Sequence, residues 1–522
     1  MKIGRMRVKT QLHYHARFLA LALLMTLIVL SVLALRNPAP APAGVALSAV
    51  PYYKLPFGPD ANGTDRPFFP SKMQSATGQF SDPARLPSSS ECASCHQREF
   101  TEWAASLHAI ADRDLIYEAV VEANEDTVSD PEKARFCEGC HAPNEMMTGR
   151  VNRFVSVPPS DALSEGVACI TCHTATKVEP EKGNGALTLA YHRAETAQAG
   201  PQGAAILADP RAHVAAYAAS DTDALMKSAE ACAACHVETY DPTNSKASAP
   251  QKVQTTFLEW RDSWYAKNGV TCQDCHMASD PAAQLRAIRD GDTSDPDRYS
   301  HRFIGANYAM TETELGDALG VLRGGLLPGM TAEANRATLE VQKRQTQGFL
   351  REAARLELRG LRRTGEGLQL DIAVQNIGAG HNLPTGVNDQ KYIWLEVTVS
   401  DAANHTLFRS GGAAERLGVE DPEAVSWIEH FLDREGKRIT DHLTFQTAAV
   451  IWQRKPIPPR GEDVISYDVP LPEGADGSLK LEARLLYRVA LPDLIYTSLR
   501  RNLSVPPFTL AELSRDLPED IR

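Results

Sequence analysis

The 522-residue chain has no cysteine outside one repeated motif. Its ten cysteines form five Cys-x-x-Cys-His sequences, which are Cys92-Cys95-His96, Cys137-Cys140-His141, Cys169-Cys172-His173, Cys232-Cys235-His236 and Cys272-Cys275-His276. Tetrahedral zinc sites would need such motifs in pairs, and five is an odd number. Disulfide bonds would not require a histidine after every second cysteine. The N-terminal segment also lacks a cysteine that could carry a lipid anchor.

The spacing that remains to be explained is the attachment signature of c-type haem. Two thiols two residues apart can reach the two vinyl groups of one macrocycle, and the histidine that follows then binds the iron as its proximal ligand. We therefore expect five covalent haems. The expected proximal ligands are His96, His141, His173, His236 and His276.

The chain also lacks an excess of positive charge. It has 54 lysines and arginines against 66 aspartates and glutamates, a net charge of -12. This balance makes nucleic acid an unlikely partner. The acidity has two readings that stay open, namely ordinary solubility and docking to a basic redox partner.

Charged residues are absent from residues 18–35, which follow a basic leader containing Lys2, Arg5, Arg7, Lys9 and Arg17. An apolar run of this length is longer than the core of most signal peptides and just reaches the length of a spanning helix. We predict that residues 1–36 are a membrane anchor or a signal peptide. Haem is attached to thiols outside the cytoplasmic membrane, and the basic leader should stay inside. The chain is therefore expected on the periplasmic side of the bacterial inner membrane, anchored or secreted to the periplasm.

The remaining sequence changes character several times. Residues 37–90 are rich in proline and are predicted to be a tether. Residues 91–315 hold all five motifs and only short, polar helical patterns, so haems should form much of the core of this pentahaem domain. Residues 316–356 are predicted to be a helical connector, with Thr331 as the N-cap of its helix.

From residue 357 to about 512 the hydrophobic period becomes two. Leu479, Leu481, Ala483 and Leu485 alternate with charged residues, and similar alternation occurs at 368–375 and at 393–399. Such patterns predict half-buried strands, and several over about 150 residues suggest a sandwich. The expected fold is an α-rich, loop-rich multihaem domain followed by a C-terminal all-β sandwich-like domain.

The functional class depends on the sixth ligand of each iron, because a second histidine makes an electron carrier and an open position permits substrate chemistry. Of fifteen histidines, five are proximal, and His13 and His15 lie in the leader. We predict His108, His213, His301 and His381 as distal ligands, with His192 as a weaker fifth. We interpret His405, His430 and His442 as surface residues. Met146, Met147 and Met277 follow motifs closely and are candidates only where a histidine fails.

Several stretches resemble a known family. They are residues 137–143 (Cys-Glu-Gly-Cys-His-Ala-Pro), residues 165–173 (Glu-Gly-Val-Ala-Cys-Ile-Thr-Cys-His), residues 254–260 (Gln-Thr-Thr-Phe-Leu-Glu-Trp), residues 269–277 with the fifth motif, and residues 301–306 (His-Arg-Phe-Ile-Gly-Ala). They are similar to multihaem c-type cytochromes related to the tetrahaem carriers of ammonia oxidisers and, more distantly, to hydroxylamine oxidoreductase. The resemblance implies distal roles for His108, His213, His301 and His381, and it offers no clear counterpart for His192.

Two functions follow from these observations. The first is electron transfer by a periplasmic pentahaem cytochrome whose partners are other redox proteins, either a quinol-oxidising membrane protein or further cytochromes. The alternative is an oxidoreductase acting on a small nitrogen or sulfur compound at one open haem. No motif here ends in lysine, as the active-site motif of pentahaem nitrite reductase usually does. Hydroxylamine oxidoreductase needs more haems and a tyrosine cross-link.

Overall fold

The computed structural model describes residues 68–83, 86–112, 114–127, 136–149, 165–191, 209–241, 249–311, 331–412, 424–472, 478–500, 503 and 505–518. All of these belong to one compact unit, formed by residues 51–152 and 159–522, and a second unit comprises residues 1–50 and 153–158. The leader, most of the predicted tether and His192 lie outside the described residues. Within the described part of the chain, no helix is long and apolar enough to span a membrane.

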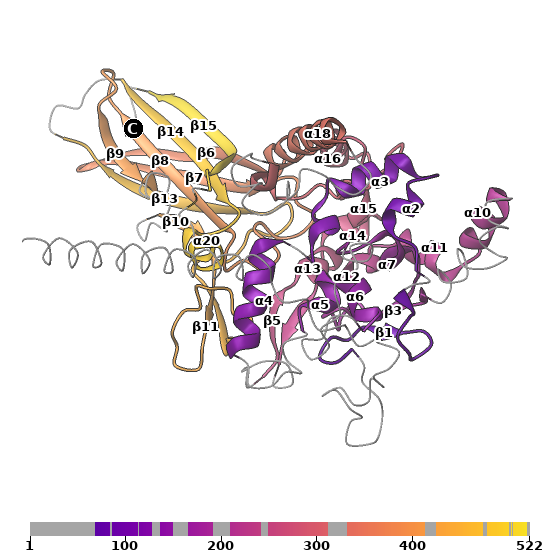
Figure 1. Cartoon of the computed structure of the whole chain (residues 1–522). Coiled ribbons are helices and arrows are strands. Elements are labelled where there is room, and N and C mark those ends of the chain that lie inside the picture. Colours follow the sequence, from indigo (N-terminus) through magenta and orange to yellow (C-terminus); the bar gives the residue numbers. More distant parts are fainter. Residues whose placement is uncertain are drawn as a thin grey trace, which may run out of the picture. The chain divides into compact units, whose positions relative to one another are not determined.

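The part of the chain that carries the motifs is built from short helices (Figure 1). They are α2 (Ser89–Cys92), α3 (Gln97–Ala104), η4 (Leu107–Ile110), α4 (Leu115–Thr127), α5 (Glu138–His141), α6 (Pro143–Met147), α7 (Cys169–His173), α10 (Pro210–Ala218), α11 (Asp221–Met226), α12 (Glu230–Ala233), α13 (Thr256–Arg261), α14 (Trp264–Lys267), α15 (Cys272–His276), α16 (Pro281–Arg289) and η6 (Tyr308–Thr311). Five short strands lie among them, namely β1 (Gln74–Ser75), β2 (Ala175–Val178), β3 (Leu187–Leu189), β4 (Glu238–Tyr240) and β5 (Gln251–Gln254).

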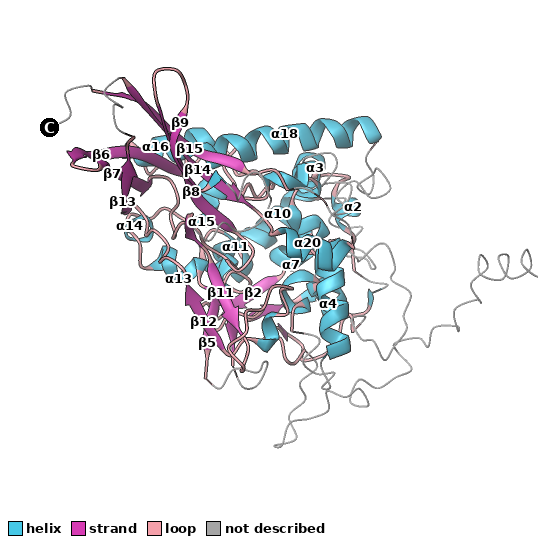
Figure 2. Ribbon diagram, turned by 90° about the vertical axis from the view of Figure 1, so that its left-hand side faces the viewer, coloured by secondary structure: helices cyan, strands magenta, loops and turns pink. Residues whose placement is uncertain are grey.

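A single long helix, α18 (Ala332–Arg351), leads from this part to the strands. Thr331 is its N-cap, as predicted, and the Thr331 side chain accepts a hydrogen bond from the backbone N–H of Ala334 at 3.1 Å. Such a bond satisfies one of the free donors at a helix start. Figure 2 shows α18 extending from above α3 to the strands, where its residues contact β15.

After residue 353 strands dominate. They are β6 (Ala354–Thr364), β7 (Gly367–Asn376), β8 (Tyr392–Ser400), β9 (Thr406–Ser410), β10 (Val425–Trp427), β11 (Glu429–Leu432), β12 (Ala449–Trp452), β13 (Glu462–Pro470), β14 (Leu479–Arg488) and β15 (Phe508–Leu517), with η8 (Thr444–Gln446) and α20 (Pro492–Leu499) between them. One sheet has the order β10-β8-β14-β15, with β9 also paired to β8, and a second has the order β13-β7-β6. Side chains from both sheets share one apolar cluster, for example Ile372 and Leu481, which are fully buried.

The predicted alternation holds for β14 and fails for β8. In β14, Leu481 and Ala483 are buried while Glu482 is exposed. In β8, Trp394 and Glu396 were expected to be half-exposed, but both are buried. The reason is that β8 lies between β10, β9 and β14 in the sheet and is covered on both faces, where Glu396 forms ion pairs with two arginines.

Candidate haem-binding sites

Each motif lies in or beside one helical turn, which sets the direction of its two thiols. Helix α15 is the clearest case, because Thr271 and Asp274 form a capping box at its start. Residues three apart in a helix lie on the same face. Cys272 and Cys275 are therefore presented together, and His276 ends the turn, as attachment of one macrocycle requires.

Two proximal histidines have their Nδ1 atoms engaged by backbone carbonyls. The Nδ1 atom of His141 lies 3.0 Å from the carbonyl oxygen of Ala111, and that of His276 lies 2.6 Å from the carbonyl oxygen of Ile304. A carbonyl can only accept, so Nδ1 carries the proton and Nε2 keeps its lone pair when the ring is neutral. Metal-binding histidines are usually oriented in this way.

Two predicted distal histidines lie opposite motif histidines. The ring centroids of His173 and His301 are 6.4 Å apart with planes inclined by 19°, and those of His276 and His381 are 6.2 Å apart with planes inclined by 13°. Two imidazoles on opposite sides of one metal, each with a nitrogen about 2 Å from it, have centroids about 6 Å apart. The spacing of both pairs fits one iron between the rings.

Burial keeps these rings neutral at ordinary pH. Desolvation lowers the pKa of His108, His173 and His276 to about 4 and that of His236 to about 3, and neighbouring histidines add to the effect. A ligating imidazole must be deprotonated at the nitrogen that binds the metal. The environment of these histidines therefore suits iron ligation.

The other predicted distal ligands are less directly placed. His108 lies on η4, packs edge-on against Phe303 with centroids 4.4 Å apart, and is close enough to His236 to lower its pKa after the larger effect of burial. His213 is exposed on α10. The predicted distal role of His213 stays a prediction. The same is true of His192, which lies outside the described residues.

The interpretation of three histidines as surface residues fits one of them fully and the other two only in part. His405 is exposed, as expected, with a side-chain exposure of 77%. His430 on β11 is half-buried. The His442 side chain is 28% exposed and its Nδ1 atom lies 2.9 Å from Oδ2 of Asp389. Asp389 precedes His442 by 53 residues, and no local pattern in the sequence connects the two.

The methionines near the second motif are packing residues. Met146 and Met147 are fully buried in one apolar cluster with Leu189 and Tyr191. Met73 belongs to the same cluster, which agrees with the packing role expected for methionine in a core.

Thiols of different motifs are neighbours. A hydrogen bond with the Cys169 thiol raises the pKa of Cys92, and a bond with Cys235 raises that of Cys140. A third such bond, with Cys272, raises the pKa of Cys232. These contacts join the first motif to the third, the second to the fourth, and the fourth to the fifth.

The third and fourth motifs are also close to each other. Burial, followed by the charges of Cys232 and Cys235, raises the pKa of Cys172 to about 12. With this link the five motifs form one connected set, in which the fourth motif lies near three others.

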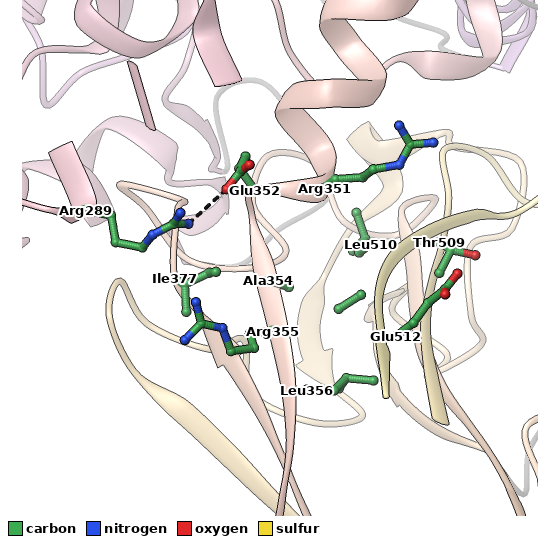
Figure 3. Close-up of a pocket in the computed structure, with 11 residues that line it drawn as sticks. Arg289, Arg351, Glu352, Ala354, Arg355, Leu356, Ile377, Thr509, Leu510 and Glu512 are labelled. Carbon is green, nitrogen blue, oxygen red and sulfur yellow. Dashed lines mark hydrogen bonds and ion pairs between the residues drawn. The ribbon is translucent and has the colours of Figure 1, made fainter. Parts of the chain in front are cut away.

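A surface cavity of about 430 Å³ lies elsewhere, between α16, the end of α18, β6 and β15. Figure 3 shows Arg289 pointing toward Glu352, with an ion pair of 3.0 Å, and Arg351 on the far side. The residues that line it include neither a cysteine nor a histidine. This cavity is therefore not one of the haem-binding sites.

Comparison with known proteins agrees with the motifs. The family model described as cytochrome c554 and c-prime matches residues 91–174. A penta-heme cytochrome c552 from Thermochromatium tepidum has a similar fold, with a TM-score of 0.51 and 19% identity over 84% of this chain and 100% of that chain. No curated protein matches the chain. The family match covers the first three attachment motifs and, with the two further motifs, supports the assignment to the multihaem c-type cytochromes and a general role in electron transfer.

Proposed function

We propose that the protein is a pentahaem c-type cytochrome that carries electrons on the periplasmic side of the inner membrane. The observation that carries this proposal is the connected set of five motifs, in which every motif has a thiol next to a thiol of another. Haem iron supplies one-electron chemistry when bound. Haems attached at neighbouring thiols would lie close together, as transfer between them requires.

The side chains around the motifs have the task of holding and tuning the irons. His173 with His301, and His276 with His381, supply imidazoles at the spacing of two axial ligands. Carbonyl groups fix the ring orientation of His141 and His276. Closed coordination on both sides favours electron transfer over binding of a substrate.

The strands have a place in the same proposal. His381 follows β7 in a glycine-rich loop, so the proposed C-terminal β domain supplies a ligand to the haem attached at Cys272 and Cys275. We propose that the α-rich haem domain and this sandwich-like domain are joined through that ligand. A distant relation to hydroxylamine oxidoreductase is part of the same proposal and rests on the segments quoted above.

The first motif is the proposed point of electron exchange with partners. Cys95 and His96 are exposed, whereas Cys275 is buried. The partners would be a quinol-oxidising membrane protein or further cytochromes, reached through the acidic surface of the chain. The exposure of His96 and of His213 also favours the alternative function, because an open haem at this motif could act on a small nitrogen or sulfur compound.

One preparation tests both functions. The protein is expressed with the haem-attachment machinery, its intact mass is measured, and the oxidised and reduced forms are examined by electron paramagnetic resonance and by exposure to carbon monoxide. Five haem increments, low-spin iron throughout and no carbon monoxide binding are expected for the carrier. Fewer than five increments would contradict the pentahaem proposal, and turnover of nitrite or hydroxylamine would favour the enzyme.

A further inference from the structure

The turn at His442 has an unusual backbone. His442 has a φ of 60°, in the left-handed region of backbone conformation that residues other than glycine seldom adopt. It lies between β11 and β12, two residues before the start of η8. The backbone N–H of Thr444 donates to the His442 carbonyl at 2.7 Å, so the turn is held in this conformation. Residues kept in such conformations cluster at functional sites.

The His442 ring is oriented by a buried carboxylate. Its Nδ1 atom lies 2.9 Å from Oδ2 of Asp389, a residue whose side chain is 1% exposed. Gln390 Nε2 donates to the same oxygen at 3.1 Å. With Nδ1 donating to Asp389, Nε2 keeps its lone pair, and a carboxylate behind an imidazole is the arrangement that orients many metal-binding histidines.

The turn packs against the second motif. Leu443 belongs to one apolar cluster with Phe136 and Tyr240, and Cys137 packs against that cluster. The hydroxyl groups of Tyr240 and Thr444 are also hydrogen-bonded to each other. Phe136 and Cys137, at the start of the second haem attachment site, are thus held close to the residues that follow His442.

The free nitrogen of His141 is directed away from η4. Nδ1 of His141 is bonded to Ala111, which directly follows η4 and its His108, and the ring of Tyr117 stacks on one face of His141 with centroids 4.4 Å apart. The two nitrogens of an imidazole point in widely different directions, so Nε2 faces away from that turn. His442 lies close enough to His141 for the two rings to interact electrostatically.

The geometry points to His442, oriented by Asp389, as the distal ligand of the haem attached at Cys137 and Cys140. This inference rests on the proposed function, because it needs a haem at the second motif. It also changes the ligand count, since His442 joins His108, His213, His301 and His381 as the fifth distal histidine and His192 is no longer needed.

The test uses the full-length holoprotein with His442→Asn. Asparagine tolerates the left-handed conformation and its amide can still donate to Asp389, so the turn should be retained while the imidazole is lost. We expect one fifth of the iron to become high-spin, to bind carbon monoxide when reduced, and to return to low spin on addition of free imidazole. His405→Asn is the matched control, because His405 has the same bond to an aspartate, at 3.0 Å to Asp401, on an exposed turn.

A second variant tests the positioning role. Asp389→Asn should leave the iron low-spin and raise the reduction potential of one haem, because the imidazole loses the carboxylate that strengthens it as a donor. Purely low-spin His442→Asn protein with five haem increments would overturn the inference and leave the pentahaem proposal intact. A native protein without haem at Cys137 and Cys140 would overturn both, and the intact mass distinguishes the two failures.

Discussion

The motif-bearing part and the strand-rich part of this chain differ in the size of the hydrophobic core that their own side chains form. Between residues 68 and 311 the buried apolar side chains form small separate clusters, and most helices have four to nine residues. After residue 353, nine- to eleven-residue strands share one large cluster with contributions from both sheets. Isolated short helices are marginal in water, and packing usually supplies their stability. The motif-bearing part should therefore depend on its haems, and the strand-rich part should not.

The largest effect should come from removing one attachment site. Replacing both Cys169 and Cys172 by serine would remove the proposed haem between His173 and His301 and the contacts that it would make with α7. We expect the loss of stability to exceed about 4–5 kcal/mol, the level at which changes become exceptional. Limited proteolysis should cleave the motif-bearing part first and spare the strands. Simultaneous loss of both parts would break the comparison.

The second prediction concerns the strand-rich part, where a substitution creates a cavity in the apolar cluster that the two sheets share. Leu481 is fully buried on β14, and Leu481→Ala should cost about 2–5 kcal/mol. The haem absorption spectrum should stay unchanged at temperatures where the variant is folded. Lys480→Ala, on the outward face of the same strand, is the control and should have an effect within about 0.5 kcal/mol. Spectral changes in folded Leu481→Ala would show that the two parts are not independent.

A smaller effect is expected where the two parts meet. The Glu259 carboxylate on α13 accepts hydrogen bonds from the Asn382 backbone N–H at 3.1 Å and from the Thr385 hydroxyl at 2.6 Å. Glu259→Ala removes both bonds, leaves the Asn382 N–H without its carboxylate partner, and should cost about 1–3 kcal/mol. Because the bonds hold the loop of His381, a fraction of the fifth haem should become high-spin. Asp262→Ala, an exposed change directly after the same helix, should leave the spin state unaltered.

As the pH falls, we expect the third haem to lose its distal ligand before the strand-rich part unfolds. Burial alone would raise the pKa of Glu102, but hydrogen bonds from Arg298 and from the His301 backbone N–H outweigh it and hold this pKa below its ordinary value of 4.5. Its stabilising contribution is complete above the ordinary value and is lost as the pH falls through the lower, folded one. Absorption spectroscopy should show His301 leaving its iron in that range. Glu102→Gln should abolish this pH-dependent step, and an unchanged acid transition in that variant would contradict the assignment.

The smallest effect concerns the helix between the two parts. Thr331→Ala removes the N-cap of α18 and should cost about 1 kcal/mol, with no spectral change. Thr331→Ser keeps the hydroxyl and should restore most of the stability. Thermal unfolding followed by circular dichroism measures both. An equal loss in the two variants would mean that the hydroxyl is not the stabilising group.

The sequence predicts those features whose signal is local. The five motifs, the N-cap Thr331 and the alternation in β14 each depend on residues within a few positions, and each is found where expected. The burial of Glu396 could not be predicted, because it depends on neighbouring strands and on two arginines, Arg409 and Arg484, that lie distant in the chain.

The same limit explains the histidines. His276 and His381 are 105 residues apart, and the sequence predicted each as an iron ligand without pairing the two. His442 had no such help, because its carboxylate partner and the second motif lie far away in the sequence. Long-range pairings of this kind become visible only when the chain is folded.

The closeness of thiols from different motifs has a consequence for how the protein is made. Cys92 and Cys169, Cys140 and Cys235, and Cys232 and Cys272 are hydrogen-bonded partners in the folded chain. In an oxidising compartment, neighbouring free thiols can be joined as disulfides. In such a compartment, cross-linking would block the attachment sites of a chain that folded before receiving its haems, and we therefore expect haem addition to precede compaction of the motif-bearing part.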